Sequence, residues 1–369
     1  MYYTLIMTTK YHLPQKLSGG KLDLNYNKFA IELADAEYAM GLLQGSQKKL
    51  QNASLLISPL TAKEATVSSK IEGTQSTVSD VFLHEAGGET KHPDIAEVAN
   101  YRAAMNFSIH ELQNGRKLSN HLIKTLHNIL LKNTRHKGFL GEFRKGDVWI
   151  AEKHGDPIDK AIYVPPQPHF VNDYVDDLLK YLNEGNESTL IKAGLAHYQF
   201  EAIHPFDDGN GRIGRLLIPL ILYHGNRLSK PIFYISGYME RNRDGYIDSL
   251  HEVDKTLHFE TWLKFFFKSV AEQLKETQKI VEDIYDLYDD IKNNFETNKS
   301  PYLIHFLDFI FRSPILTVPM VRRMTKIKSD LTVKRLIKSF IQLGYIKGTS
   351  RRQDRAKLYS FTPLLNILK

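Results

Sequence analysis

Apolar residues recur with a helical period over most of the chain. In the longest example, from Glu260 to Phe295, they stand at Trp262, Phe265, Phe266, Val270, Leu274, Ile280, Ile284, Leu287, Ile291 and Phe295. This spacing predicts one or two long amphipathic helices. A shorter amphipathic segment runs from Phe29 to Leu43, and the polar stretch from Asn293 to Pro301 is typical of a linker. The pattern indicates a mainly α-helical protein.

Two short β-rich pieces interrupt the helical pattern. They are Val148–Ile150 and Ala161–Val164, which flank a loop with Gly155, Asp156 and Pro157 and end at Pro165 and Pro166. We interpret them as a hairpin. A single hairpin in a helical protein is either a surface element without a function of its own or an element that packs against or binds a partner.

A break between two helical patterns holds the most informative segment, His204 to Arg215. One pattern enters it through Leu190–Phe200, and another leaves it through Ile213–Ile221. Pro205 and the run Gly209–Gly211 break the helix between them. Because glycine permits positive φ, successive backbone N–H groups can form a concave anion site there, and the N-terminus of the following helix adds positive charge.

The side chains of this segment suit phosphate chemistry. Arg212 and Arg215 are three residues apart and share a helix face, where guanidinium groups can clamp phosphate oxygens. Asp208 offers the hard oxygen that Mg²⁺ prefers. His204 precedes a proline, which predicts an extended backbone there, and its imidazole can accept a proton from an attacking hydroxyl. The segment predicts a phosphate-transfer site.

Two other functional interpretations of this segment fail, and a third interpretation gives it a purely structural role. Gly209-x-Gly211-x-x-Gly214 matches a dinucleotide fingerprint, but a helical pattern precedes it, and the next acid after Asp208 is Glu240. A kinase glycine loop would need catalytic-loop and metal-binding motifs downstream, which the chain lacks. The structural alternative is a helix–turn–helix corner with a buried histidine and surface arginines.

The formal net charge of +7 is concentrated in residues 301–369, which we call the C-terminal module. It holds 14 Lys and Arg and three Asp, a net charge of +11, which leaves −4 for the other 300 residues. The pattern predicts a winged helix with helices at Tyr302–Phe311 and Pro319–Met324. A third helix is capped by Ser329 or Asp330 and ends at Gly344, and a hairpin with Arg351–Arg355 at its tip follows. Such a module either binds DNA or serves for packing, dimerisation or target binding.

The motif resembles the signature of the Fic family at every position. The matching residues are His204, Phe206, Asp208, Gly209, Asn210, Gly211, Arg212 and Arg215. Gly141–Arg144 and the hairpin up to Pro166 also resemble the family, so that the likeness covers about residues 60–275. The resemblance implies a Fic-type helical bundle with a β-hairpin flap. It also implies protein adenylylation, in which AMP passes from ATP to a Ser, Thr or Tyr hydroxyl of a target protein.

The resemblance also implies roles for single residues. His204 would be the catalytic base, Asp208 the Mg²⁺ ligand and Phe206 a core anchor. ATP would be held by Gly209, Asn210, Gly211, Arg212, Ile213, Gly214, Arg215 and Tyr246. The flap residues Val148, Trp149, Ile150 and Ala151 would align the target by strand addition. Family members that phosphorylate carry Lys where this chain has Gly211, which favours AMP transfer here.

Thr66–Gly73 reads as the end of an amphipathic helix, with Val67 and Ile71 on one face, Ser68 and Glu72 on the adjoining face and Gly73 as the C-cap. By itself this pattern predicts an ordinary helix with a solvated Glu72. Ser-x-x-x-Glu-Gly upstream of the motif also resembles the inhibitory helix of the family. That resemblance implies that Glu72 pairs with Arg215 and removes the clamp for the γ-phosphate.

Composition sets the remaining limits. Hydrophobic residues make up 42% of the 369 positions, and no cysteine is present, which excludes disulfides, thiolate metal sites and a Cys nucleophile. The N-terminus has no secretory pattern, and the longest apolar run, Leu216–Tyr223, is too short to cross a bilayer. We therefore expect a cytoplasmic protein with no membrane partner, and the family makes a homodimer plausible.

The expected domains are an N-terminal helical region (1–95) with the inhibitory helix near 60–73, a Fic core (96–275), a helical linker (276–300) and the winged helix (301–369). Two functions stay open. One is an adenylyltransferase inhibited by Glu72, and the other is a DNA-binding regulator whose pocket senses nucleotide.

Overall fold

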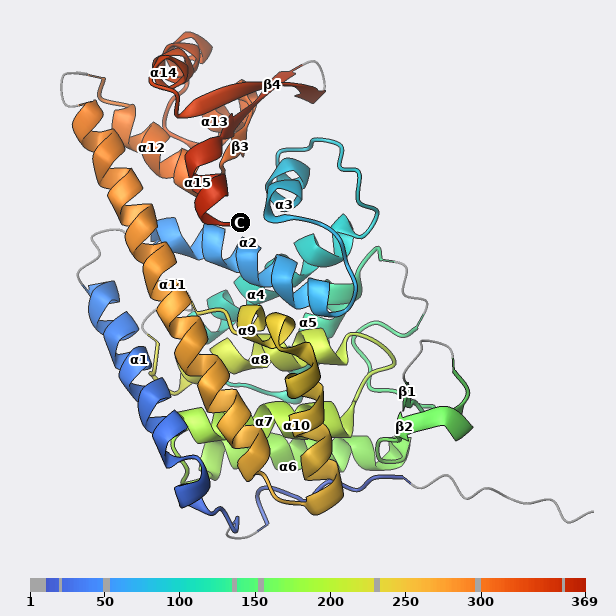
Figure 1. Cartoon of the computed structure of the whole chain (residues 1–369). Helices are drawn as coiled ribbons and strands as arrows, with labels where there is room; N and C mark the ends of the chain where they lie inside the picture. The colour runs from blue at the N-terminus through green and yellow to red at the C-terminus, as the bar shows by residue number, and fades with distance from the viewer. Residues whose placement is uncertain are drawn as a thin grey trace, which may run out of the picture.

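The computed structural model of the protein describes residues 11–19, 22–48, 54–134, 138–151, 156–228, 233–295, 300–353 and 356–369. Its described part is mainly helical, as the sequence predicts (Figure 1). Helices α1 to α5 come first in the chain. Their bounds are α1 (Ala30–Lys48), α2 (Ser54–Ile71), α3 (Val78–Glu85), α4 (Ile95–Gln113) and α5 (Asn120–Leu131).

The centre of the fold is the helix pair that flanks the motif. The bounds of this region are α6 (Val171–Glu184), α7 (Thr189–Ile203), α8 (Asn210–His224), α9 (Ser236–Arg241) and α10 (Arg243–Thr256). Helices α7 and α8 pack side by side, and nearly every residue of both is buried. α7 has buried residues on all of its faces, because α6, α8 and α11 pack around it, and the motif loop begins at its end.

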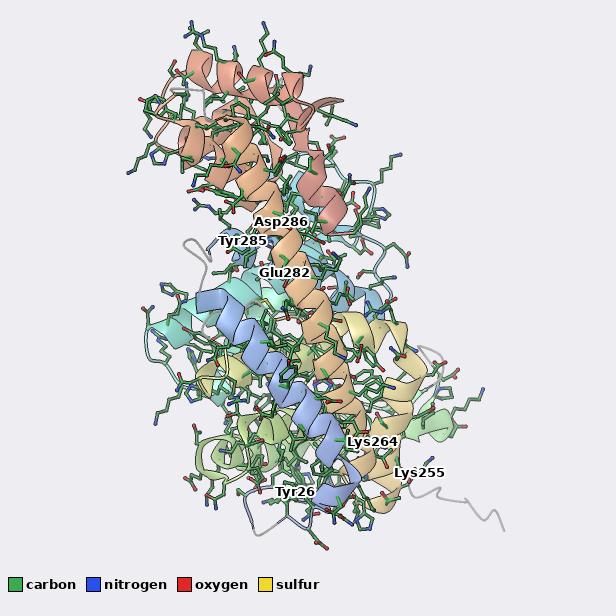
Figure 2. All side chains as sticks on the ribbon, turned by 60° about the vertical axis from the view of Figure 1, so that its left-hand side comes forward. Tyr26, Lys255, Lys264, Glu282, Tyr285 and Asp286 are labelled. Carbon is green, nitrogen blue, oxygen red and sulfur yellow. The ribbon has the colours of Figure 1, made fainter. Side chains whose placement is uncertain are left out.

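One continuous helix, α11 (Glu260–Asn294), accounts for the long apolar pattern. It packs against α1, α7 and α10 at one end and reaches the C-terminal module at the other. Lys264 lies beside α1 and pairs with Glu32, whereas Glu282, Tyr285 and Asp286 lie nearer the module (Figure 2).

Two expected domain boundaries fall within helices. The boundary at 275/276 falls within α11, whose apolar stripe runs on without a break, so that the expected helical linker is the second part of this helix as far as Asn294. The 95/96 boundary falls in the first turn of α4. Asn293 and Asn294 still belong to α11, and the linker residues 296–299 lie outside the described residues.

The predicted hairpin is present in shortened form. β1 (Ile150–Ala151) pairs antiparallel with β2 (Ala161–Tyr163), Ile150 facing Tyr163. Val148 and Trp149 precede β1 and are not part of the strand. The predicted loop residue Gly155 lies outside the described residues, and Pro157 leads into a 3-10 turn at Ile158–Lys160.

The C-terminal module contains three helices and a hairpin in the predicted order, plus two elements that we did not predict. Its elements are α12 (Leu303–Arg312), β3 (Ile315–Leu316), α13 (Val318–Met324), α14 (Asp330–Gln342), β4 (Ile346–Gln353), β5 (Ala356–Phe361) and α15 (Thr362–Ile367). β3 and α15 are the additions, and β5 lies between β3 and β4. Ser329 caps α14 by accepting from the backbone N–H of Thr332 at 3.4 Å.

Only part of the predicted hairpin tip, Arg351–Arg355, lies outside the strands. Arg351, Arg352 and Gln353 belong to β4, because the strand runs further than its alternating pattern suggests, and Asp354 and Arg355 lie outside the described residues. The winged-helix interpretation of the module stays a prediction. Among the described helices, none combines the length and apolar character that a membrane span requires.

Candidate active site

His204 ends α7 and opens the motif loop. Its backbone is left-handed (φ 48°, ψ 60°), and its N–H donates to the carbonyl of Phe200 at 3.0 Å. The extended backbone that we predicted from Pro205 is therefore wrong, because closing the last turn of α7 prevails over the local preference. A non-glycine residue in this region costs about 1 kcal/mol or more, and such strain is common at functional sites.

The motif loop is closed by Phe206 and Asn210. The Asn210 side chain accepts from the backbone N–H of Phe206 at 2.9 Å and donates to the carbonyl of Phe206 at 2.8 Å. Phe206 is fully buried, in agreement with a core anchor. Because the amide of Asn210 is used inside the loop, any phosphate contact of this residue would come from its backbone.

His127 of α5 supports the loop from behind. Its ring stacks on Phe206 with 3.8 Å between centroids. Nδ1 accepts from the backbone N–H of Gly141 at 2.9 Å, and Nε2 lies 3.1 Å from the carbonyl of Asp208. The first bond fixes the tautomer, so Nε2 is the donor. We did not predict His127, because a single histidine on an amphipathic helix carries no signal of its partners.

Arg144 joins the hairpin to the motif loop. Its backbone N–H donates to the carbonyl of Pro205 at 2.9 Å, and its buried guanidinium donates to the carbonyls of His204 at 2.8 Å, Ile203 at 3.3 Å and Pro166. A single side chain thus links the residues on both sides of the hairpin to the end of α7.

A cavity of about 240 Å³ brings several of the predicted residues together. The predicted residues that line it are Glu72, Ile150, His204, Gly211, Arg215 and Tyr246. Unpredicted ones include Glu201, Arg243, His251 and Asp254. Residues from α2, the hairpin, α7, α8 and α10 therefore meet at one place, although up to about 180 positions separate them in the chain.

Other predicted residues do not line this cavity. Ile213 is buried in the core, and Gly214 packs so closely that an added Cβ would lie 2.3 Å from Glu201 Oε1. Gly209 provides the positive φ of +80° at the N-cap of α8. Arg212 donates to Glu97 at 2.8 Å and to Asp208 Oδ1 at 3.2 Å. The Arg212 side chain is buried, so the alternative of a helix–turn–helix corner with surface arginines is wrong for this residue.

Arg215 is fully buried and bound by the end of α2. Its Nε donates to Ser68 Oγ at 2.9 Å, and its Nη2 donates to the Ser68 carbonyl at 2.9 Å and to Glu72 Oε1 at 2.6 Å. An added Cβ on Gly211 would lie 2.4 Å from the same Glu72 oxygen. The Glu72 carboxylate is therefore held directly over the glycine loop, in an ion pair and not simply solvated.

Burial sets the protonation states in the cavity. Burial lowers the pKa of His204 to about 4, so its imidazole is neutral at pH 7. Burial also raises the pKa of Glu201 to about 7. Burial by itself would raise the pKa of Glu72, but the charge of Arg215 outweighs it, and the pKa lies below its ordinary value.

Tyr246 and the hairpin complete the walls. The Tyr246 hydroxyl lies 2.7 Å from Nε2 of the buried His197, and its ring packs near Trp262. Trp149 is 40% exposed and donates to the carbonyl of Asp156 at 2.7 Å, so only Ile150 of the predicted flap residues faces the cavity.

The chain belongs to the Fic/DOC family. The family descriptions "Fic/DOC family N-terminal" and "Fic/DOC family" match residues 31–110 and 117–222, together half of the chain. A probable protein adenylyltransferase of Aquifex aeolicus (aq_aa38) is 35% identical over 96 residues, which are 26% of this chain and 28% of that protein. The Caenorhabditis elegans protein adenylyltransferase fic-1 is 42% identical over 65 residues, 16% of this chain and 12% of that protein. The chain thus covers little more than a quarter, or less, of these relatives.

Solved structures show the same fold at low identity. A Fic family protein from Desulfovibrio desulfuricans aligns with a TM-score of 0.57 and 18% identity, over 89% of this chain and 95% of that one. Fic-1 from C. elegans aligns with a TM-score of 0.52 and 20% identity, over 69% of this chain and 73% of that one. These likenesses establish the Fic fold of the chain.

Proposed function

We propose that this protein is a protein adenylyltransferase that transfers AMP from ATP to a hydroxyl of a target protein, and that Glu72 inhibits it. The observation that carries the proposal is the meeting of neutral His204, Gly211 and buried Arg215 at one cavity. The names of the relatives support the same activity.

In the proposed reaction, the target hydroxyl attacks the α-phosphorus of ATP. The new bond joins the hydroxyl oxygen to phosphorus, the bond to the bridging oxygen of the β-phosphate breaks, and pyrophosphate leaves. His204 takes the hydroxyl proton, for which an imidazole that is neutral at pH 7 is suited. The buried guanidinium of Arg215 would hold the terminal phosphate oxygens once Glu72 has left it.

Asp208 fits the role of a Mg²⁺ ligand in this reaction. Its carboxylate is 49% exposed at the N-terminus of α8, where ATP phosphates would lie. Within the described ranges, no group of three or more His, Asp or Glu forms a metal cage. One carboxylate oxygen together with phosphate oxygens and water is the usual set for Mg²⁺. When bound, Mg²⁺ would neutralise charge on the phosphates.

The proposed inhibition follows from charge and space. Glu72 Oε1 neutralises Arg215 at 2.6 Å and lies over Gly211, so a phosphate at that place would meet both a carboxylate and an occupied guanidinium. Like charges at such short range repel each other, also where one of them, as Glu72, is 39% exposed. We infer that ATP binds productively only after Glu72 moves.

The test identifies the transferred group. Glu72→Gly is incubated with ATP labelled on the α-phosphate, and in parallel with ATP labelled on the γ-phosphate. The proposal expects protein-bound label from the α-phosphate alone. Label from the γ-phosphate would indicate phosphorylation and contradict it.

A second candidate function, DNA binding by the C-terminal module, is favoured by one observation. α13 and α14 pack against each other and expose Arg323, Lys334, Arg335 and Lys338. Basic residues on such a helix pair are suited to duplex phosphates. Binding of a random duplex at low salt would support this function, and its absence would exclude it.

A further inference from the structure

Glu201 is a carboxylic acid that lines the cavity and that the proposed reaction leaves without a role. It lies on α7, one turn before His204, and its side chain is 15% exposed. Its Oε1 is shielded from solvent and has no hydrogen-bond partner in the parts of the chain that the structure describes. His197 Nε2, at 4.0 Å, is too far away to donate to it. A carboxyl oxygen that lacks both water and a donor is poorly suited to carry a negative charge.

Glu201 and Glu72 lie over the same side of α8, which packs beside α7 (Figure 1). A Cβ added to Gly211 would lie 2.4 Å from Glu72 Oε1, and one added to Gly214 would lie 2.3 Å from Glu201 Oε1. Residues three apart on a helix have Cβ atoms about 5–6 Å apart, so the two oxygens are separated by no more than about 11 Å. Because both positions are glycine, neither contributes a side chain that would separate the two carboxyl groups.

One cation, Arg215, acts on both carboxyl groups. Glu72 holds it in a direct ion pair of 2.6 Å. Burial raises the pKa of Glu201 to about 7 against the charge of Arg215, and the charge of Glu72 adds to the rise. A second carboxylate beside a cation that is already paired gains little attraction and meets repulsion. Glu72 therefore carries the charge in this pair of acids, and Glu201 changes its protonation near neutral pH.

Two further titratable groups lie close to Glu201, and both are uncharged at pH 7. Burial lowers the pKa of His197 to about 3, and burial raises the pKa of Tyr246 well above its ordinary value. The other titratable or charged side chains that line the cavity come from the hairpin, α7 and α10, and are Tyr163, Tyr198, His204, Arg243, His251 and Asp254. Among all of these groups, the charges that act on the pKa of Glu201 are those of Arg215 and Glu72.

We propose that Glu201 takes up a proton from solvent when ATP binds, so that the terminal phosphate on Arg215 meets a neutral carboxyl instead of a second anion. The inference rests on the proposed function, in which the phosphate replaces Glu72 on Arg215. Once Glu72 has left, Glu201 remains as a carboxylate whose charge acts on the buried guanidinium. The phosphate takes over that role, and its negative charge favours the neutral form of Glu201. The affinity for ATP therefore falls as the pH rises, because an ionised Glu201 must first be protonated.

The test is isothermal titration calorimetry of the full chain carrying Glu72→Gly, with Mg²⁺ and α,β-methylene-ATP, which is not cleaved at the α-phosphorus. Titrations at pH 8 in two buffers of different ionisation enthalpy give the number of protons taken up on binding. The pKa of about 7, which removal of the Glu72 charge lowers further, leaves Glu201 ionised at pH 8, so we expect uptake of about one proton. Glu72→Gly/Glu201→Gln should take up almost none. Equal uptake by the two proteins would overturn the inference.

The affinities give a second readout. The dissociation constant of Glu72→Gly, divided by that of Glu72→Gly/Glu201→Gln, should rise about tenfold or more from pH 6 to pH 8, since each pH unit above the pKa costs a factor of about ten. The ratio cancels the titration of the nucleotide itself. A ratio that does not change with pH would contradict a proton on Glu201.

Two controls test whether the proton belongs to Glu201 and to the terminal phosphate. Asp254→Asn in the Glu72→Gly background is the matched variant, because Asp254 lines the same cavity and bonds Tyr198 and His251. It should keep the proton uptake, and a loss equal to that of Glu201→Gln would assign the proton to another group. ADP, which lacks the terminal phosphate, should cause little uptake, and uptake equal to that with the ATP analogue would contradict the proposed contact.

A measurement on Glu72→Gly alone covers the case that Glu201→Gln does not fold. Its infrared difference spectrum should gain the band of a protonated carboxyl when the ATP analogue binds at pH 8. Binding without this band would overturn the inference.

The two proposals can fail separately. If Glu72→Gly binds the analogue with uptake of a proton but incorporates no label from ATP, the proposed function is wrong and the role of Glu201 stands. If it incorporates label and binds the analogue without proton uptake, the reverse holds. Absence of any nucleotide binding would overturn both.

Discussion

The buried Arg215 and the 39% exposed side chain of Glu72 form an ion pair across 143 positions of the chain, with Nη2 and Oε1 2.6 Å apart. Ser68, one helical turn before Glu72, accepts two further bonds from the same guanidinium. Three bonds from one side chain therefore hold the end of α2 against the glycine loop, next to His204.

Ser68→Ala should weaken the restraint without abolishing it. The variant loses the bond from Arg215 Nε but keeps Glu72 and the backbone bond. A hydrogen bond to a charged group contributes about 1.5–3 kcal/mol, which sets an upper limit for the effect. Labelling by α-labelled ATP should rise several-fold and stay below that of Glu72→Gly. Ser69→Ala is the control, since this buried hydroxyl has no hydrogen-bond partner in the described parts of the chain; a rise in that variant too would contradict the account.

The pH dependence of labelling should reveal the depressed pKa of His204. A base works only when unprotonated, and the pKa of about 4 keeps His204 neutral until the solution is well below pH 6. Glu201 in the same cavity has a pKa near 7, so the profile is best measured in Glu72→Gly/Glu201→Gln. The rate should be flat from pH 8 to 6 and fall toward pH 4, with circular dichroism as the check on folding. A midpoint near 6.5, the ordinary value for histidine, would disagree with a buried base.

Arg144→Lys should destabilise the fold although it keeps the charge. Lysine cannot reproduce the fork that serves the carbonyls of His204, Ile203 and Pro166, so buried acceptors lose their donors. We expect a loss of about 2–4 kcal/mol in the free energy of unfolding by urea, together with reduced labelling in the Glu72→Gly background. Lys145→Ala changes an exposed neighbour and should stay within about 0.5 kcal/mol of the wild type. Equal stabilities of the two variants would show that Arg144 does not brace the loop.

The sequence predicts the helical elements and the motif well, because their signals are local. The apolar stripe of α11 and the break between α7 and α8 are visible within short windows. The apolar pattern from Glu260 to Phe295 predicts the extent of α11 (Glu260–Asn294), although its last two residues, Asn293 and Asn294, also read as part of a polar linker. The extended backbone predicted for His204 is wrong, because the capping of α7 depends on the whole helix and not on the adjoining proline.

The supporting residues of the site could not be predicted from a single sequence. His127 and Arg144 act by bonding carbonyls far along the chain, and nothing in their own neighbourhoods indicates those partners. The proximity of Glu72 to Arg215 was expected only from the family resemblance, since the pattern around Glu72 by itself favours a solvated side chain. The contact of α2 with the C-terminal module was not foreseen, because it depends on tertiary packing.

The decisive experiment compares wild type, Glu72→Gly and Glu72→Gly/His204→Ala with α-labelled ATP. In the proposed function Glu72 restrains a reaction that needs the His204 base, so label is expected on the single variant only, with ATP still bound by the double variant. A positioned base contributes about 10²–10⁴-fold, so its loss should be unmistakable. Equal labelling of the wild type and Glu72→Gly, or undiminished labelling without His204, would contradict the account.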